Sequence, residues 1–184
     1  MRAAVTSAIT SALLLAFAHP CLSQIGETRE ELIRRYGKCQ PERAGKPKGP
    51  GVYDSVIDEG CSFRHDDLYI TSMFKAGRAV SFYYRKVPKE QTFWASLFHG
   101  KGELYRELSD DEVSTLLRLA APGAQWVVVP SDSTIRRWQT SDSSAYAYYF
   151  ASGHYNRHQL LVQTAAVDAV FKKVDDVIRG LRPN

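Results

Sequence analysis

The spacing of apolar residues predicts two amphipathic helices, and each has its own start signal. Thr28 and Ser109 are both followed three positions later by a glutamate, Glu31 and Glu112. In this capping box the hydroxyl accepts from an amide of the first turn, and the carboxylate accepts from the amide of the capping residue. Apolar residues then recur at helical spacing, and a glycine follows each stretch. We therefore predict that helices begin directly after Thr28 and Ser109.

The end of the chain predicts the most amphipathic helix. Its apolar residues fall on one stripe: Val167, Val170, Phe171, Val174, Val177, Ile178 and Leu181. The charged residues of the same segment lie on the other side of the helix, which favours a helix packed along one face. Aromatic residues at helical spacing also predict a short helix over Gln91–Phe98.

Segments rich in aromatic and β-branched residues predict antiparallel strands. The clearest is a hairpin whose strands run from Leu68 to Phe74 and from Ala79 to Arg85, with Gly77 in the turn. Four further strands are predicted over Gln125–Val129, Thr134–Gln139, Ala145–Phe150 and Gln159–Thr164. The polar run between the second and third of these is typical of a turn.

Capped helices followed by antiparallel strands predict an α+β fold. We expect an antiparallel sheet with helices packed on one face, ending in the C-terminal amphipathic helix. The order of helix and then strands occurs twice, over residues 24–100 and 101–184. The two halves share no convincing residue identity. A single domain over residues 24–184 and two tandem helix-plus-strands modules within it therefore both stay open.

The composition is that of a globular domain. Of the 184 residues, 44% are hydrophobic and 24% are charged, which excludes a disordered polar chain as the main body. The formal net charge is +4, and the lysines and arginines are scattered along the chain. A nucleic-acid-binding surface needs a denser basic patch, so we predict no nucleic-acid partner.

The first 23 residues predict a secretory signal peptide. Arg2 is followed by the apolar block Leu13–Ala18 and then by small and polar residues up to Ser23. The apolar stretch is too short for a stable membrane span, which needs about 20 apolar residues. We expect cleavage near Ser23 and a secreted or periplasmic protein that begins at Gln24.

The cysteines are interpreted together with this cleavage. It would remove Cys21 and leave Cys39 and Cys61 as an even pair in an oxidising compartment. Such a pair favours a disulfide over free or metal-binding thiols. Acylation of Cys21 as a lipoprotein is disfavoured, because His19-Pro20 stands where a lipoprotein signal has small residues.

No group of residues predicts a catalytic or metal site, and we predict no cofactor. His154 and His158 have the spacing of a helical zinc pair, but a glycine and polar residues place them in a loop, and a third ligand is missing. His65 precedes Asp66 and Asp67, and strand alternation favours Asp67 as its neighbour. No nucleophile or oxyanion donor accompanies it, so we interpret this segment as the polar start of a strand.

Tyrosines on both faces of the predicted strands provide the candidate binding residues. Only one face of each strand is needed for a core. Exposed tyrosine beside arginine is common in protein interfaces and sugar-binding surfaces. We therefore select Tyr83, Tyr148 and Arg137 as binding candidates. The alternative is that a helix covers this outer face of the sheet.

Motifs in both halves of the chain carry a resemblance. Ile25-Gly26-Glu27-Thr28, followed by Arg35-Tyr36-Gly37-Lys38, resembles the opening of small, uncharacterised secreted bacterial proteins. The segment from Trp138 to Tyr149 is similar to a hairpin in their second half. The opening also resembles helix starts in the SmpA/OmlA outer-membrane assembly lipoproteins and in the β-lactamase inhibitor protein. This resemblance implies a non-catalytic α+β module that binds other proteins, and it assigns no functional residue.

These observations favour an exported, non-enzymatic protein that binds an unknown protein or a component of the cell envelope. The alternative is a hydrolase of envelope polymers that uses His65 or His154 with a carboxylate. An enzyme of that kind needs a pocket where the two groups converge.

Overall fold

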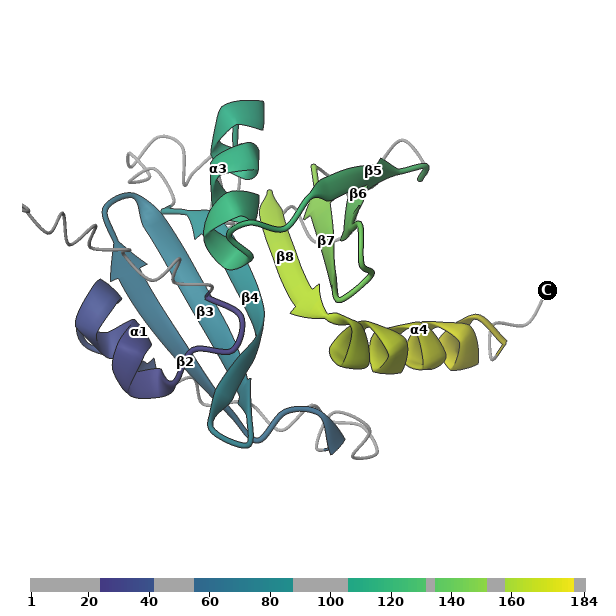
Figure 1. Ribbon diagram of the computed structural model, residues 1–184. Coiled ribbons are helices and arrows are strands. Elements are labelled where there is room, and N and C mark those ends of the chain that lie inside the picture. Colours follow the sequence, from purple (N-terminus) through teal and green to yellow (C-terminus); the bar gives the residue numbers. More distant parts are fainter. Residues whose placement is uncertain (1–23, 42–54, 88–105, 132–134, 152–157, 181–184) are drawn as a thin grey trace, which may run out of the picture.

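The described part of the chain forms an antiparallel sheet accompanied by helices (Figure 1). The computed structural model describes residues 24–41, 55–87, 106–131, 135–151 and 158–180. The helices are α1 (Arg29–Tyr36), α3 (Asp110–Ala120) and α4 (Ala165–Gly180). The strands are β1 (Gln40–Pro41), β2 (Glu59–His65), β3 (Leu68–Lys75), β4 (Arg78–Lys86), β5 (Trp126–Val129), β6 (Ile135–Thr140), β7 (Ala145–Phe150) and β8 (Gln159–Thr164).

Across the sheet the strands follow the chain order up to the centre and the reverse order beyond it. Across the described strands the order is β1-β2-β3-β4-β8-β7-β6-β5, and each neighbouring pair is antiparallel. The first four strands thus appear in chain order and the last four in reverse, so that β4 lies beside β8. The predicted α+β fold with an antiparallel sheet is confirmed.

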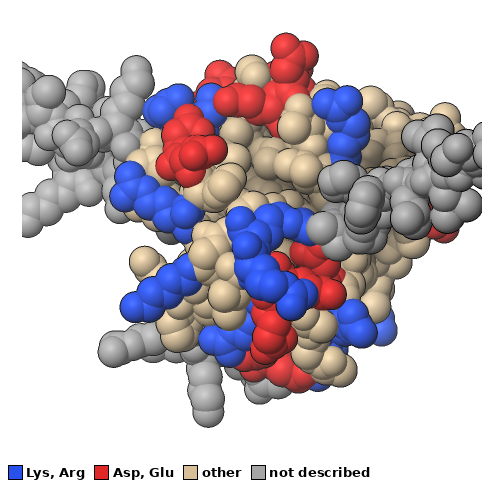
Figure 2. Space-filling view, turned by 60° about the vertical axis from the view of Figure 1, so that its left-hand side comes forward, with Lys and Arg blue, Asp and Glu red and all other residues tan. Residues whose placement is uncertain are grey.

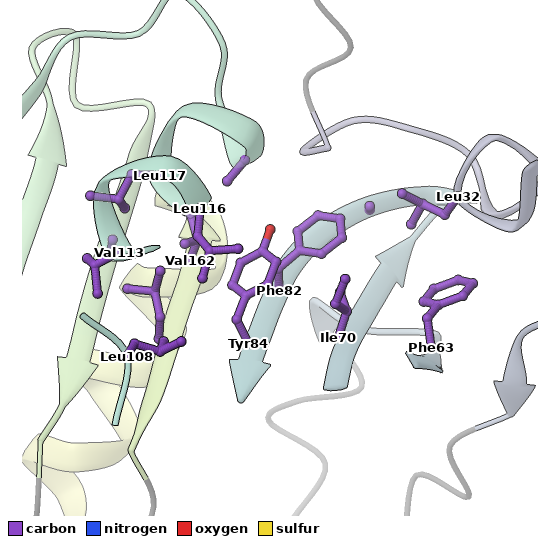
Figure 3. Close-up of a cluster of buried hydrophobic side chains, with 14 of the residues drawn as sticks. Leu32, Phe63, Ile70, Phe82, Tyr84, Leu108, Val113, Leu116, Leu117 and Val162 are labelled. Atoms are coloured by element: carbon purple, nitrogen blue, oxygen red, sulfur yellow. The ribbon is translucent and has the colours of Figure 1, made fainter. Parts of the chain in front are cut away.

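One face of the sheet carries the hydrophobic core, and we call it the core face. Strand alternation places a row of buried side chains on it: Phe63, Ile70, Phe82, Tyr84, Leu160, Val162, Ala147 and Tyr149. Helix α1 adds Leu32 to this cluster, and α3 adds Val113, Leu116 and Leu117 (Figure 3). Burying one such leucine stabilises the fold by roughly 1.5–3 kcal/mol. The apolar stripes of α1 and α3 therefore hold both helices on this face.

Helix α4 contacts the opposite face of the sheet. Its Asp168 accepts hydrogen bonds from Tyr148 and Gln163, whose sequence neighbours Tyr149 and Val162 point into the core. In Figure 1 this helix continues directly from the end of β8. The prediction that the helices pack on one face is therefore wrong for α4. An apolar stripe shows that a helix is packed, but it does not show which face of a sheet receives it.

Both predicted helix starts are confirmed. Thr28 Oγ1 accepts from the amide of Glu31 at 3.3 Å, and the Glu31 carboxylate accepts from the amide of Thr28 at 2.7 Å. Ser109 and Glu112 make the same reciprocal pair, at 3.3 and 2.6 Å. Gly37 ends α1 with a φ of +85°, a conformation that glycine adopts without strain.

The predicted strands are present, but β1 and β2 are additional strands that the sequence does not predict. Glu59–His65 contains a glycine and charged residues and follows a stretch rich in proline and glycine. It is a strand because it pairs with β3 along its whole length and buries Cys61 and Phe63. The predicted signal peptide and the helix predicted over Gln91–Phe98 lie outside the described residues.

The disulfide between Cys39 and Cys61 is confirmed. The two Cα atoms lie 5.7 Å apart, and 22 positions separate the residues in the sequence. The bond ties the segment after α1 to the buried part of β2, so it fixes α1 on the outer half of the sheet.

Candidate binding face

The three predicted binding residues lie in one row across the sheet. Tyr83 of β4 and Tyr148 of β7 both stand opposite Leu161 of β8, and Arg137 of β6 stands opposite Tyr148. This row is on the side away from the core face, and we call it the tyrosine face. Tyr83, Tyr148 and Arg137 are all partly exposed there, whereas Leu161 is buried. The fold therefore brings together residues that are as many as 65 positions apart, from position 83 to position 148.

The Arg137 guanidinium lies against two tyrosine rings. Its central carbon is 5.5 Å from the centre of the Tyr148 ring and 5.8 Å from that of Tyr146. A cation over an aromatic face is attracted by the quadrupole of the ring. The Arg137 Nε is buried and has no hydrogen-bond partner among the described residues. The site thus combines flat apolar rings with a positively charged hydrogen-bond donor.

The first turns of α4 contact the tyrosine face through Asp168 and Lys172. Asp168 is only 2% exposed and accepts from the Tyr148 hydroxyl and, at 3.0 Å, from Gln163 Nε2. Lys172 pairs with Asp168 at 2.7 Å, and its ammonium lies 4.7 Å from the centre of the Tyr146 ring. A buried carboxylate needs such partners, because burial without them removes its hydration. Asp168 therefore anchors α4 to β7 and β8.

Burial is the main reason that the pKa of Tyr148 is raised above its usual value of 10.0, and the hydrogen bond to Asp168 and its charge act in the same direction. The Tyr148 hydroxyl consequently stays protonated at physiological pH and remains a donor to Asp168. The Tyr148 ring lies against the Arg137 guanidinium, whose positive charge opposes the rise in the pKa of Tyr148 without cancelling it.

Sequence reasoning missed the contribution of α4 to this site. Asp168, Lys172 and Gln163 were not among the binding candidates, although Asp168 follows Val167 of the apolar stripe. The sequence signal for Asp168 is its place beside an apolar residue in the first turn of an amphipathic helix, where a carboxylate is expected to need a partner. Its three partners come from two strands and from the same helix, so they could not be identified before the topology was known.

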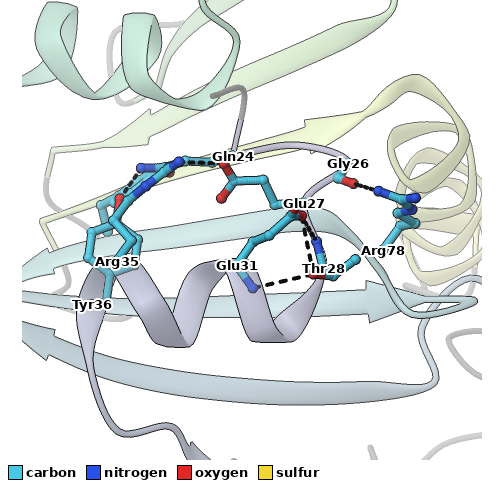
Figure 4. Close-up of polar contacts among 9 residues, drawn as sticks. Gln24, Gly26, Glu27, Thr28, Glu31, Arg35, Tyr36 and Arg78 are labelled. Atoms are coloured by element: carbon cyan, nitrogen blue, oxygen red, sulfur yellow. Dashed lines mark hydrogen bonds and ion pairs between the residues drawn. The ribbon is translucent and has the colours of Figure 1, made fainter. Parts of the chain in front are cut away.

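A second polar cluster lies beside α1 (Figure 4). Gln24 is fully buried, and its side chain bridges two tyrosines: Nε2 donates to the Tyr36 hydroxyl, and Oε1 accepts from the Tyr84 hydroxyl. Beside it Arg35 donates to the carboxylate of Glu27, which is 5% exposed. The cluster joins the N-terminal segment, α1 and β4.

Burial shifts the titration of these groups. It raises the pKa of Glu27 above its usual value of 4.5, and the Arg35 guanidinium opposes this shift without cancelling it. Burial likewise raises the pKa of Tyr36, and that of Tyr84 rises well above 10.0. Both tyrosines therefore remain protonated, and Tyr84 needs its proton to donate to Gln24 Oε1.

This cluster gives a structural reason for the N-terminal motif. Glu27 pairs with Arg35, Thr28 caps α1 through Glu31, and Tyr36 bonds to Gln24. These contacts position α1 on the sheet, and each lies within the protein. Four residues of the motif, Glu27, Thr28, Arg35 and Tyr36, thus have a structural role.

His65 does not have the neighbour that strand alternation favours. Its Nε2 lies 3.7 Å from Asp66, which adopts a φ of +52° in the turn after β2, while Asp67 pairs with Arg106 at 3.0 Å. The preference for Asp67 is therefore wrong, because the strand ends at His65 and alternation no longer applies. His65 is 50% exposed and Asp66 88% exposed. His154 lies outside the described residues.

Open grooves lie beside α3 in the described part of the chain. One of about 470 Å³ lies between α1 and α3 and is lined by Arg35, Thr115, Arg118, Leu119 and Pro122. Another of about 260 Å³ lies along α3 beside Leu68 and Leu108. His65 lines neither groove, so neither provides the convergence of His65 with a carboxylate that the hydrolase alternative needs.

The described residues contain no cluster of three or more histidine, cysteine, aspartate and glutamate side chains that could hold a metal ion. Within the same residues, no helix has the length and apolar character needed to cross a membrane. On the side of the molecule seen in Figure 2, lysines and arginines alternate with acidic residues instead of forming one basic patch.

Comparisons with known proteins assign no family. No protein-family model matches the sequence, and no curated protein matches it. Among solved structures the chain is similar to a cysteine-rich secretory protein (SAV1118) from Staphylococcus aureus subsp. aureus Mu50, with 14% identity and a TM-score of 0.40. The match covers 78% of this chain and 46% of that one, so the chain spans about half the length of the matched protein.

Proposed function

We propose that the protein is an exported, non-enzymatic module that binds another protein or a component of the cell envelope through its tyrosine face. The observation that carries this proposal is the shared row of Tyr83, Tyr148 and Arg137. These residues face away from the core, and the core is already filled by other side chains of the same strands. The side chains of Tyr83, Tyr148 and Arg137 are thus not needed to fill the hydrophobic core.

The chemistry of the tyrosine face supports this role. Tyrosine supplies a large contact area at a small entropic cost, and arginine adds donors for carboxylates, carbonyls or hydroxyls. Both residue types are enriched at the centres of protein interfaces. Asp168 and Lys172 hold Tyr148 and Tyr146 in place, which reduces the entropy lost when a partner binds.

Export of the chain is the second part of the proposal. The Cys39–Cys61 disulfide fits an oxidising compartment outside the cytoplasm. We propose that residues 1–23 are removed as a signal peptide, that Cys21 leaves with them, and that the mature chain is secreted or periplasmic.

The tandem organisation also belongs to the proposal. The mirrored strand order, with β4 beside β8, is the order that two tandem helix-plus-strands modules would produce when their last strands pair. Each half begins with a helix that has a capping box. We propose that residues 24–100 and 101–184 are such modules within one domain.

The test is capture of envelope components by the exported protein and its variants. Wild type, Tyr83→Ser and Arg137→Ala are immobilised and exposed to an envelope extract, and the retained components are identified by mass spectrometry. We expect wild type to retain a defined component that both variants lose by at least about tenfold, the effect of about 1.4 kcal/mol.

Leu119→Ser is the matched control, because Leu119 is 43% exposed on α3, a helix of the core face. It should retain the same component as wild type, and circular dichroism should show that all variants are folded. Equal retention by wild type, Tyr83→Ser and Arg137→Ala would contradict the assignment of the tyrosine face.

A further inference from the structure

Gln24 connects the N-terminal segment to the end of α3. The Gln24 amide nitrogen donates to the carbonyl of Leu119 at 3.3 Å, and that of Ile25 donates to Ala120 at 3.1 Å. The last four carbonyls of a helix have no partner within the helix. These two bonds satisfy carbonyls in the last turn of α3, while the Gln24 side chain is held by Tyr36 and Tyr84.

We propose that Gln24 is a mature amino terminus whose cyclisation to pyroglutamate is prevented by the native fold. The inference rests on the cleavage after residue 23 that is part of the proposed function. After that cleavage the Gln24 nitrogen is an α-ammonium group, and it lies at the C-terminal end of α3. This end carries the negative partial charge of the helix dipole and favours a cation.

Cyclisation of an N-terminal glutamine needs no other reactant. The lone pair of the neutral α-amine attacks Cδ of its own side chain, and a bond forms between them. The bond from Cδ to Nε2 breaks, one proton of the amine passes to the leaving nitrogen, and ammonia leaves. The product is a five-membered lactam. The reaction requires the amine and Cδ to approach within about 3–3.5 Å in a suitable orientation.

The structure opposes each requirement of this reaction. The backbone nitrogen is bound to Leu119, and the helix carbonyl favours the protonated amine, which has no lone pair to donate. The side-chain amide is bound at both of its polar atoms, to Tyr36 and to Tyr84. The two reacting groups are thus held by different parts of the fold, and the side chain is 0% exposed.

The product would also be incompatible with the cluster. A lactam has no NH₂ group to donate to Tyr36 and no ammonium group for the end of α3. The Tyr84 hydroxyl is buried and the Tyr36 side chain is half-buried, so leaving a polar group unpaired there is costly. Cyclisation therefore requires that the N-terminal segment first opens away from the core.

The test uses the full chain expressed in a host that exports it, followed by purification of the processed product. Intact mass and N-terminal sequencing identify its first residue. The folded protein and a sample unfolded in urea are then incubated in mildly alkaline buffer, and loss of one ammonia is followed by mass spectrometry. We expect a chain that begins at Gln24 and loses ammonia at least about tenfold more slowly when folded, since only the opened state reacts.

Tyr84→Phe removes the donor to Gln24 Oε1, so it should speed the loss of ammonia from the folded protein. Tyr69→Phe is the control, because Tyr69 lies on β3 outside this cluster. Equal rates in folded and unfolded wild type would overturn the protection of Gln24 and leave the proposal of export intact. A mature chain that begins at another residue would overturn both this inference and the proposed cleavage after residue 23.

Discussion

Glu27 shows how a single buried group can set the response of this fold to pH. Its pKa in the folded protein is raised above 4.5, because the cost of burial exceeds the attraction of Arg35. The fold therefore prefers the protonated carboxyl. The stability that this preference contributes is fully present below a pH of about 4.5 and is lost as the pH rises through the folded pKa.

We expect the substitution Glu27→Gln to reveal this dependence. Glutamine stays neutral, so the unfolding free energy of wild type relative to Glu27→Gln should fall as the pH rises from about 4 to about 7. Urea unfolding at several pH values measures the difference.

Glu31 provides a control of opposite sign in the same helix. Hydrogen bonds from Thr28 lower the pKa of Glu31, so wild type should gain stability relative to Glu31→Gln over the same range. A difference for Glu27→Gln that rises with pH would show that Arg35 outweighs burial.

At the residue scale the sequence identified the outer tyrosines but not their neighbours. Tyr83, Tyr148 and Arg137 could be selected because tyrosine beside arginine on an outer strand face is a compositional signal. Asp168 and Gln24 could not, because each is explained only by partners from distant elements. Burial of a polar group depends on whether partners are present, and the topology decides that.

At the scale of elements, local chemistry determined the helix starts, and pairing determined β2. A capping box lies within four residues, so Thr28 and Ser109 could be recognised in the sequence as caps. Strand β2 owes its conformation to pairing with β3 and to the burial of Phe63. Both depend on the tertiary fold and not on the local sequence of β2. The face that receives α4 likewise depends on how the chain leaves β8.

The cap of α1 can be tested by Thr28→Ala. The variant loses the side-chain acceptor for the amide of Glu31, which should lower the unfolding free energy by about 1 kcal/mol. Thermal unfolding followed by circular dichroism gives the comparison. Thr115→Ala, at an exposed interior position of α3, removes the same hydroxyl without removing a cap and should change stability by less than about 0.5 kcal/mol. Equal losses in the two variants would argue against a stabilising cap at Thr28.

For the whole molecule, the disulfide and the central strands act on different parts of the sheet. Strands β4 and β8 join the two halves by antiparallel pairing between Tyr83 and Leu161 and their neighbours. The bond between Cys39 and Cys61 instead restrains the outer edge, where β1 has only two residues. A short edge strand contributes little pairing of its own, so the covalent bond supplies order that the sheet lacks there.

Removing that bond should lower the stability of the whole domain. The double substitution Cys39→Ala, Cys61→Ala should reduce the unfolding free energy by about 2–4 kcal/mol, chiefly because the unfolded chain gains freedom. Its urea midpoint should be lower than that of oxidised wild type, and a reductant should lower the wild-type midpoint while leaving that of the double variant unchanged. The same midpoint for oxidised wild type and the double variant would mean that β2 and the core already hold this edge without the bond.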